Sequence, residues 1–353
     1  MSLIDDLLRS MHLRKGSDLH LVAGDPPRMR VNGELITVQN QRLDNEELRA
    51  ELGRVMTRQA VEQFEKHDAA DFAYMIPDVA RFRVNVFRHL NGLGAVFRGI
   101  PSSALTLEQL GMPESVRSLG HANRGLILVT GKTGSGKSTT LAAIVDAINT
   151  RLKGHIITIE DPIEFVHQRK MCLISQREVG VHSASFSAAL HSALREDPDA
   201  ILVGELRDLE TMSIAMTAAE MGILVMGTLH TNGAAATIDR VVNIFPADKQ
   251  DHVRNMLSTS LRGVISQQLV RKKDGTGRVA ALEILINTSA VANLIRQGKL
   301  EQLENVMQSS AAEGMCTMDS SLKRLLDSGV ISGQEAYMQA FDKSKFEQYK
   351  DIA

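Results

Sequence analysis

The chain has 353 residues, a formal net charge of −2 and 43% hydrophobic residues. This length predicts two domains, and the composition is that of a globular protein with enough apolar material for a core in each. The charge argues against a dedicated nucleic-acid binder, which usually carries a basic surplus or tract. Cys172 and Cys316, without C-x-x-C spacing, argue against a disulfide framework or a cysteine zinc site and favour a reducing compartment.

The sequence predicts neither a secretory signal nor a membrane anchor. Residues 1–6 lack a basic region followed by a long apolar run. No window approaches ~18 uninterrupted apolar residues, so we expect no transmembrane helix and no direct membrane insertion. The histidines show no pairing at metal-ligand spacing, so no histidine metal site is predicted.

The first hundred residues predict an α+β domain with an antiparallel sheet. Apolar residues at helical spacing predict a first helix over residues 4–11 and one continuous helix over residues 48–64, with Asp44 in a capping box. Asn32-Gly33 is a strong hairpin signal. Alternating and β-branched runs predict strands at residues 17–22, 29–31, 35–38, 72–74, 82–86 and 95–98.

One of these strands carries arginines along one face. Alternation in the run 81–88 separates apolar from polar side chains. Phe82, Val84 and Val86 face one way, and Arg81, Arg83 and Asn85 face the other. Taken alone, this pattern is typical of a strand with one solvated face.

After a composition break at residues 100–103, which predicts a linker, comes the most specific pattern of the chain. Gly131–Ser138 fits G-x-x-x-x-G-K-[ST] at every constrained position. An apolar run at 126–130 predicts a buried strand before it, and a helical pattern follows from Leu141. A strand, a glycine turn and a helix predict the phosphate loop of a nucleoside triphosphatase, in which backbone N–H groups turn toward phosphate oxygens.

Within this loop, Lys137 would reach the β- and γ-phosphates, and the hydroxyl of Ser138 would ligate Mg²⁺. The predicted nucleotide-binding residues are Gly131, Thr133, Gly134, Ser135, Gly136, Lys137, Ser138 and Thr139.

Apolar runs at 156–159, 200–203 and 223–226, with helical patterns between them, predict a mostly parallel sheet with helices on both faces. Ligands bind at the carboxyl ends of such strands, and polar groups stand there. Nucleotide hydrolysis needs an acid for the metal and a group that orients the attacking water. Glu205 has the position of a Walker B acid that would hold Mg²⁺, Glu164 is a candidate for polarising the water, and His230 for contacting the γ-phosphate. Farther on, the sequence predicts a charged turn from residue 271, a strand at 279–286 and small helices beyond residue 289.

Four segments together resemble the secretion-type ATPases and, within them, the type IV pilus retraction ATPases of the PilT/PilU type. The matches to their Walker A, Asp, Walker B and His boxes are Gly131–Ser138, Ile156–Phe165, Arg195–Glu205 and Gly227–Thr231. Ser17–His20, Gly314-Met315 and Asp319 match as well, so the resemblance covers nearly the whole chain.

The resemblance implies an α/β architecture with a PAS-like α+β N-terminal domain at residues 1–100 and a linker at 101–116. A RecA-like P-loop ATPase domain would follow at 117–353, with a mostly parallel sheet and a helical C-terminal part. It implies a cytoplasmic homo-hexamer that hydrolyses ATP with Mg²⁺ and powers pilus retraction and twitching motility. The ring would dock peripherally at the inner membrane, on the platform protein of the pilus machine.

The resemblance also changes the interpretation of the arginine strand. In the family, arginines of the matching run act as fingers on a neighbouring subunit's nucleotide. Arg81, Arg83 and Arg98 are therefore candidate catalytic residues, together with Glu164, Glu205 and His230. Which of Glu164 and Glu205 is the dominant base stays open.

Differences within the family narrow the type and leave alternatives open. Extension ATPases carry a longer N-terminus and a zinc-binding cysteine tetrad, so this chain favours the retraction type. Retraction motors carry Ala-Ile-Arg-Asn-Leu-Ile-Arg-Glu, whereas residues 290–297 have alanine at Ala292 and glutamine at Gln297, and Lys132 stands where primary motors usually have proline. An accessory or regulatory paralogue, paired with another retraction ATPase, therefore stays open, as does a related secretion or pilus-assembly ATPase. A DNA motor is disfavoured because a basic tract is lacking.

Overall fold

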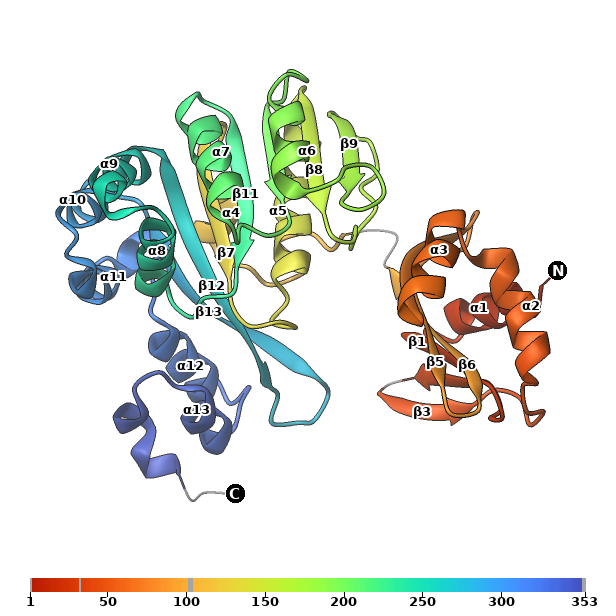
Figure 1. Ribbon diagram of the computed structural model, residues 1–353. Helices are drawn as coiled ribbons and strands as arrows, with labels where there is room; N and C mark the ends of the chain where they lie inside the picture. The colour runs from red at the N-terminus through yellow and green to blue at the C-terminus, as the bar shows by residue number, and fades with distance from the viewer. Residues whose placement is uncertain (1, 32, 101–103, 351–353) are drawn as a thin grey trace. The chain divides into compact units, whose positions relative to one another are not determined.

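A computed structural model describes residues 2–31, 33–100 and 104–350. These residues form two compact units: the first comprises the described residues up to Ile100 together with Glu164–Val166, and the second comprises Ala104–Ile163 and the described residues from His167 onward. Each unit has its own sheet (Figure 1). Asn32 of the predicted hairpin turn and residues 101–103 of the predicted linker lie outside the described residues.

The first unit is built on an antiparallel sheet, as predicted, and its helices cover one face of that sheet. Its strands follow the order β3-β2-β1-β6-β5-β4. Apolar side chains of the sheet and the helices form one core beneath the helices. The strands are β1 (Asp18–Val22), β2 (Arg28–Val31), β3 (Glu34–Thr37), β4 (Ala69–Ile76), β5 (Ala80–His89) and β6 (Gly92–Ile100); the helices are α1 (Leu3–Leu13), α2 (Asn45–Val55) and α3 (Arg58–His67).

The single helix predicted over residues 48–64 is wrong, because the chain breaks between α2 and α3. Met56 has an extended backbone, with φ −69° and ψ 135°. Thr57 then starts α3 by accepting the N–H of Ala60 through its side chain at 3.1 Å. The apolar spacing continues across the break because both helices cover the same core.

The second unit is a mostly parallel sheet with the order β13-β12-β7-β11-β10-β8-β9, in which β13 runs antiparallel to β12. This confirms the predicted architecture, although β9 and β12 were not among the predicted strands. Helices α4 and α5 cover one face, and α6, α7, α8 and α9 cover the other. The strands are β7 (Gly125–Thr130), β8 (His155–Glu160), β9 (Leu173–Glu178), β10 (Ala200–Val203), β11 (Leu224–Leu229), β12 (Leu261–Arg271) and β13 (Arg278–Ile286). The helices are α4 (Glu114–Leu119), α5 (Lys137–Arg151), α6 (Phe186–Ala193), α7 (Leu209–Glu220), α8 (Ala234–Asn243), η1 (Ala247–Lys249) and α9 (Gln250–Ser260).

Small helices complete the second unit, as predicted from the sequence. The last of them pack on the long hairpin of β12 and β13 around a separate apolar cluster that includes Val270, Met318 and Phe346. Within the described ranges, no helix combines the length and the apolar character needed to cross a membrane. The C-terminal helices are α10 (Ser289–Gln297), η2 (Leu300–Gln302), α11 (Leu303–Ser309), η3 (Ala311–Glu313), α12 (Met318–Asp327), α13 (Gly333–Gln339) and η4 (Lys343–Tyr349).

Candidate functional site

The loop between β7 and α5 presents donors for an anion. Gly136, with φ 90°, stands at the start of α5, and among the described residues no side chain caps this helix. Ser135 Oγ is buried and has no hydrogen-bond partner among the residues that the structure describes. Lys137 Nζ folds back and donates to the carbonyl oxygens of Gly131 at 2.8 Å and Lys132 at 3.1 Å. Open N–H groups at a helix N-terminus, a buried hydroxyl and an ammonium together fit phosphate oxygens.

Gln267 on β12 holds this loop from the side. Its Nε2 donates to the carbonyl of Ser135 at 2.8 Å, and its Oε1 accepts from the Thr140 hydroxyl at 2.8 Å. The loop passes so close to Gln267 that two of its positions, Gly131 and Gly136, have no room for a side chain. A Cβ on Gly131 would lie 2.3 Å from the Gln267 carbonyl oxygen, and one on Gly136 would lie 2.7 Å from Gln267 Nε2. Local sequence patterns did not single out Gln267.

The carboxyl ends of β10 and β11 bring Glu205 and His230 together. His230 Nε2 lies 3.7 Å from Glu205 Oε1, and Arg207 lies 3.6 Å from the other carboxylate oxygen. The loop at Glu205 is tied to both neighbouring strands, because the Gly204 N–H donates to Ile159 and its carbonyl accepts from the Thr228 hydroxyl. Side chains far apart in the sequence therefore meet at one edge of the sheet.

The electrostatics connect this pair to the phosphate loop. Burial lowers the pKa of Lys137, and the negative charge of Glu205 opposes that shift. Glu205 therefore lies near the ammonium of Lys137 as well as next to His230. Lys137, Glu205 and His230, which the sequence placed on three separate segments, belong to one polar edge of the sheet.

The acids at the end of β8 and just after it occupy different environments. Glu160 is buried, and its Oε1 accepts from the Thr158 hydroxyl at 2.6 Å and from Gln176 Nε2 at 3.3 Å. The Asp161–Pro162 peptide bond is cis. Glu164 follows in a loop and is exposed. Glu164 can therefore meet water, as can the exposed Asp161, whereas Glu160 is enclosed.

The candidate arginines lie in the first unit, on the sheet face opposite its helices. Arg83 on β5 is the register partner of Arg98 on β6, and Arg81 lies two residues earlier on β5. Arg98 Nε donates to Oδ1 of the buried Asp18 at 2.8 Å, while 68% of the Arg98 side chain is exposed. Arg83 Nε lies 3.9 Å from Asp71.

Asp18 is well suited to hold Arg98. Burial would raise the pKa of Asp18, but hydrogen bonds from Ser17 and Arg98 outweigh it, so its pKa lies below the ordinary value. The carboxylate therefore stays charged and fixes one end of the guanidinium. A buried partner therefore sets the orientation of Arg98.

Comparisons with known proteins decide the family. The family model described as "Type II/IV secretion system protein" matches residues 1–337. The chain is 52% identical to the type IV pilus retraction ATPase PilT of Pseudomonas aeruginosa over 96% of this chain and 98% of that protein. The chain belongs to this family.

Other members agree with the PilT/PilU type. The type IV pilus ATPase PilU of Pseudomonas aeruginosa is 42% identical over 95% of this chain and 88% of its own length. A crystal structure of the pilus retraction motor PilT with bound ADP superimposes with a TM-score of 0.91, at 43% identity, covering 99% of both chains. The chain is thus a secretion-type ATPase of the PilT/PilU type with a PilT-like fold, as the resemblance implied.

Gln267 provides a first test of how this ATPase holds its phosphate loop. Replacing Gln267 by methionine keeps an unbranched side chain but leaves the Thr140 hydroxyl and the Ser135 carbonyl without their partner. We expect the free energy of unfolding to fall by about 1–3 kcal/mol. We also expect a fluorescent adenine nucleotide to bind about tenfold more weakly, because the loop is no longer fixed.

Denaturant unfolding and nucleotide titration measure both effects. Gln268→Met is the matched control, since Gln268 is the next residue on β12 and is only half-buried. Equal nucleotide affinity in the Gln267 and Gln268 variants would show that Gln267 does not hold the loop.

Proposed function

We propose that this chain couples ATP hydrolysis to the retraction of type IV pili, and so to twitching motility. The observation that supports the chemistry is the approach of Lys137, Glu205 and His230 at one sheet edge, next to a loop built for phosphate. The relatives at 52% and 49% identity, the retraction ATPase PilT and a twitching motility protein of Neisseria gonorrhoeae, support the biological role.

The second unit holds the nucleotide in this proposal. Lys137 leaves the loop carbonyls and binds the β- and γ-phosphates of ATP, together with N–H groups from Gly131 to Thr139. Ser138 is exposed at the start of α5, where its hydroxyl would hold Mg²⁺ with Glu205. Bound Mg²⁺ would neutralise charge that develops on the phosphate oxygens.

The remaining polar residues act on the reacting groups. Glu164 polarises the attacking water, and His230 contacts the γ-phosphate at the end of β11. Because His230 lies next to Glu205, loss or gain of the γ-phosphate changes the charge that faces both side chains. The strand ends thereby sense which nucleotide is bound.

The proposed assembly is a homo-hexamer, with residues 1–100 and 117–353 as two domains joined by a linker at 101–116. Arg81, Arg83 and Arg98 of one subunit reach the nucleotide of its neighbour. Closure of the domains around ATP and reopening after hydrolysis would turn the inner-membrane platform protein and release pilin subunits from the fibre base.

A specific departure supports a second candidate function, that of an accessory ATPase in a mixed ring. On α10, Ala292 and Gln297 replace an arginine and a glutamate of the motor motif. Gln297 is exposed and donates to Asn293 at 3.3 Å, so its difference changes the surface of α10 and leaves the buried Val291 and Ile295 in place. An accessory subunit would bind nucleotide and turn over little ATP by itself.

Complementation distinguishes the two functions. In a twitching bacterium deleted for every retraction ATPase gene, we expect this gene alone to restore twitching zones, and the purified protein to hydrolyse ATP. Restoration only alongside a paralogue, combined with slow turnover of the isolated protein, would favour the accessory role. Brisk turnover without any restoration would contradict the retraction proposal.

A further inference from the structure

Glu283 is a buried acid that lies outside the residues assigned so far. It stands on β13 between Leu282 and Ile284, and only 6% of it is exposed. Its Oε1 accepts the N–H of Ala234 at 2.6 Å, and its Oε2 accepts the N–H of Met318 at 3.1 Å. Ala234 is the first residue of α8, and Met318 is the first residue of α12. One carboxylate therefore holds the N-termini of two helices, whose partial positive charge compensates its burial.

Helix α8 begins immediately after the loop that carries His230. Gly233, the residue before α8, has φ 92° and provides no side-chain cap. Its N–H donates to the hydroxyl of Ser266 at 2.9 Å, and Ser266 is the register partner of Glu283 on the neighbouring strand. Two consecutive backbone N–H groups are thus held by side chains from two adjacent strands. The position of residues 230–233 depends on these acceptors.

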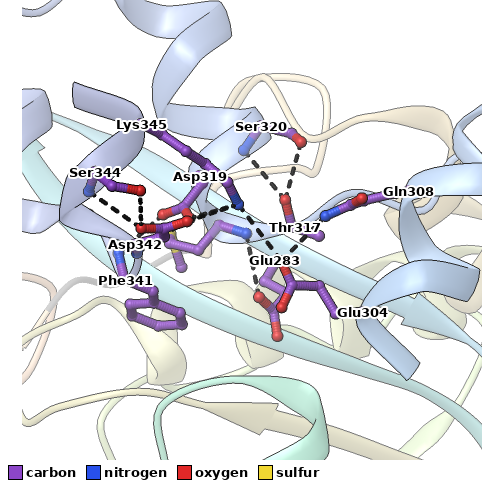
Figure 2. Close-up of polar contacts among 11 residues, drawn as sticks. Glu283, Glu304, Gln308, Thr317, Asp319, Ser320, Phe341, Asp342, Ser344 and Lys345 are labelled. Atoms are coloured by element: carbon purple, nitrogen blue, oxygen red, sulfur yellow. Dashed lines mark hydrogen bonds and ion pairs between the residues drawn. The ribbon is translucent and has the colours of Figure 1, made fainter. Parts of the chain in front are cut away.

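On its other side, Glu283 is bonded to α12, whose second residue, Asp319, holds residues 341–345. Asp319, next to Met318, accepts the N–H groups of Phe341 at 2.8 Å and Asp342 at 3.2 Å. Lys345 Nζ lies 3.3 Å from Asp319 and 3.6 Å from Glu304 (Figure 2). These hydrogen bonds and the ion pair join α12 to residues 341–345.

A cavity of about 420 Å³ lies where the loop and the C-terminal helices meet. Asn232 and Gly233 line it from the loop, Glu304 and Asp319 line it from α11 and α12, and Phe341 lines it from the turn after α13. Glu283 lines the same cavity and bonds to a residue on each side. Burial raises the pKa of Glu283, the two N–H groups oppose the shift, and the charges of Glu304 and Asp319 add to it.

We propose that Glu283 is a positioning residue, which fixes the start of α8, and through it His230, relative to α12. The inference rests on the proposed function, in which His230 contacts the γ-phosphate. A buried charge is poor at adding stability, but it specifies geometry when both oxygens have defined partners. Through this carboxylate, the loop at the phosphates and the C-terminal helices share one fixed point.

The test is Glu283→Gln, which keeps the size of the side chain but turns one acceptor into a donor that faces a backbone N–H. We expect kcat for ATP to fall about 10–100-fold, because small displacements of reacting groups are costly. The Kd for a fluorescent ADP analogue should stay within about threefold of wild type, since the Lys137 loop is not touched. Amide hydrogen exchange should become faster in both residues 229–240 and residues 315–322, because both segments lose the same acceptor. Glu304→Gln is the control, because Glu304 lines the same cavity but, among the described residues, contacts the side chains of Lys345 and Gln308 rather than a helix N-terminus.

Ser266→Ala is a second variant, which removes the neighbouring acceptor without removing a charge. It should lower kcat more than it weakens ADP binding, and it decides the question if Glu283→Gln does not fold. An unchanged kcat in the Glu283 variant, or loss of ADP binding in step with kcat, overturns the positioning role. If the wild-type protein does not hydrolyse ATP, the proposed function is contradicted instead. Amide hydrogen exchange in residues 229–240 and 315–322 of the Glu283 variant then still tests whether Glu283 couples these two segments.

Discussion

Replacing Lys137 by alanine is expected to lower ATP turnover by about 10²–10³-fold or more, since a preorganised charge at the phosphates is lost. The side chain is only 8% exposed and already points at the loop, where it donates to the carbonyl oxygens of Gly131 and Lys132. An arriving phosphate gives this ammonium a charged partner instead of two neutral ones. Phosphate release at saturating ATP measures turnover, and nucleotide titration separates binding from chemistry.

The matched control is Lys132→Ala in the same loop. The Lys132 side chain is exposed, and the carbonyl that accepts from Lys137 is kept, so we expect turnover within about threefold of wild type. Melting curves of both variants establish that the fold is intact. Hydrolysis by the Lys137 variant at the wild-type rate would show that the assignment of this loop is wrong.

The strand, turn and helix start that carry the candidate phosphate loop, and the strand ends, could be predicted because their signals are local. Residues 126–138 contain a buried strand, a glycine turn and a helix start in one uninterrupted stretch. Glu205 and His230 each follow an apolar run, and parallel strands place their carboxyl ends at one edge. Their approach to 3.7 Å therefore follows from two strand assignments and the topology of the sheet.

Gln267 and Glu283 were missed as site residues because their partners are remote in the chain. Gln267 bonds to Thr140, 127 residues earlier, and nothing in the local pattern of β12 indicates that contact. Glu283 did leave a signal, since an acid inside the apolar run 279–286 must be paired or exposed. The run does not indicate which helix N-termini supply the N–H groups.

The edge strand β9 and the break between α2 and α3 were not predicted, for a different reason. β9 has the sequence Leu-Ile-Ser-Gln-Arg-Glu and pairs only with β8 at the edge of the sheet, so it lacks the apolar run that marks a central strand. The break at Met56–Thr57 was hidden because α2 and α3 bury the same face. Apolar periodicity reports which core is covered, not whether one helix or two cover it.

Replacing Arg98 by alanine is the second large effect expected, a loss of about 10³–10⁵-fold in kcat if Arg98 acts as an arginine finger. Asp18 holds its Nε at 2.8 Å and leaves the rest of the guanidinium exposed on the sheet face. Arg98→Lys should not restore activity. The planar guanidinium of arginine can donate to Asp18 through Nε while its two terminal nitrogens contact phosphate oxygens, and lysine has a single nitrogen for both tasks. Asp18→Asn should cost less than Arg98→Ala, because the arginine remains but is held by a neutral partner.

Arg88→Ala is the matched control for the arginine variants. Arg88 lies on β5, is paired with Asp68 at 2.7 Å and is 49% exposed, but it packs against Phe64 on the helical side of the sheet. We expect its turnover within about threefold of wild type. Equal losses in the Arg88 and Arg98 variants would point to a general disturbance of the first unit rather than to a finger.

Mixing two inactive variants tests whether the arginine acts on a neighbour. A Lys137→Ala subunit keeps Arg98, and an Arg98→Ala subunit keeps the phosphate loop. If the finger reaches across a subunit boundary, assembly of the two proteins creates some sites with both groups, and ATP turnover rises well above that of either protein alone. If Arg98 serves the nucleotide of its own subunit, every site in the mixture lacks one group, and turnover stays at the level of the separate variants. The first outcome makes the ring, not the single chain, the unit of catalysis.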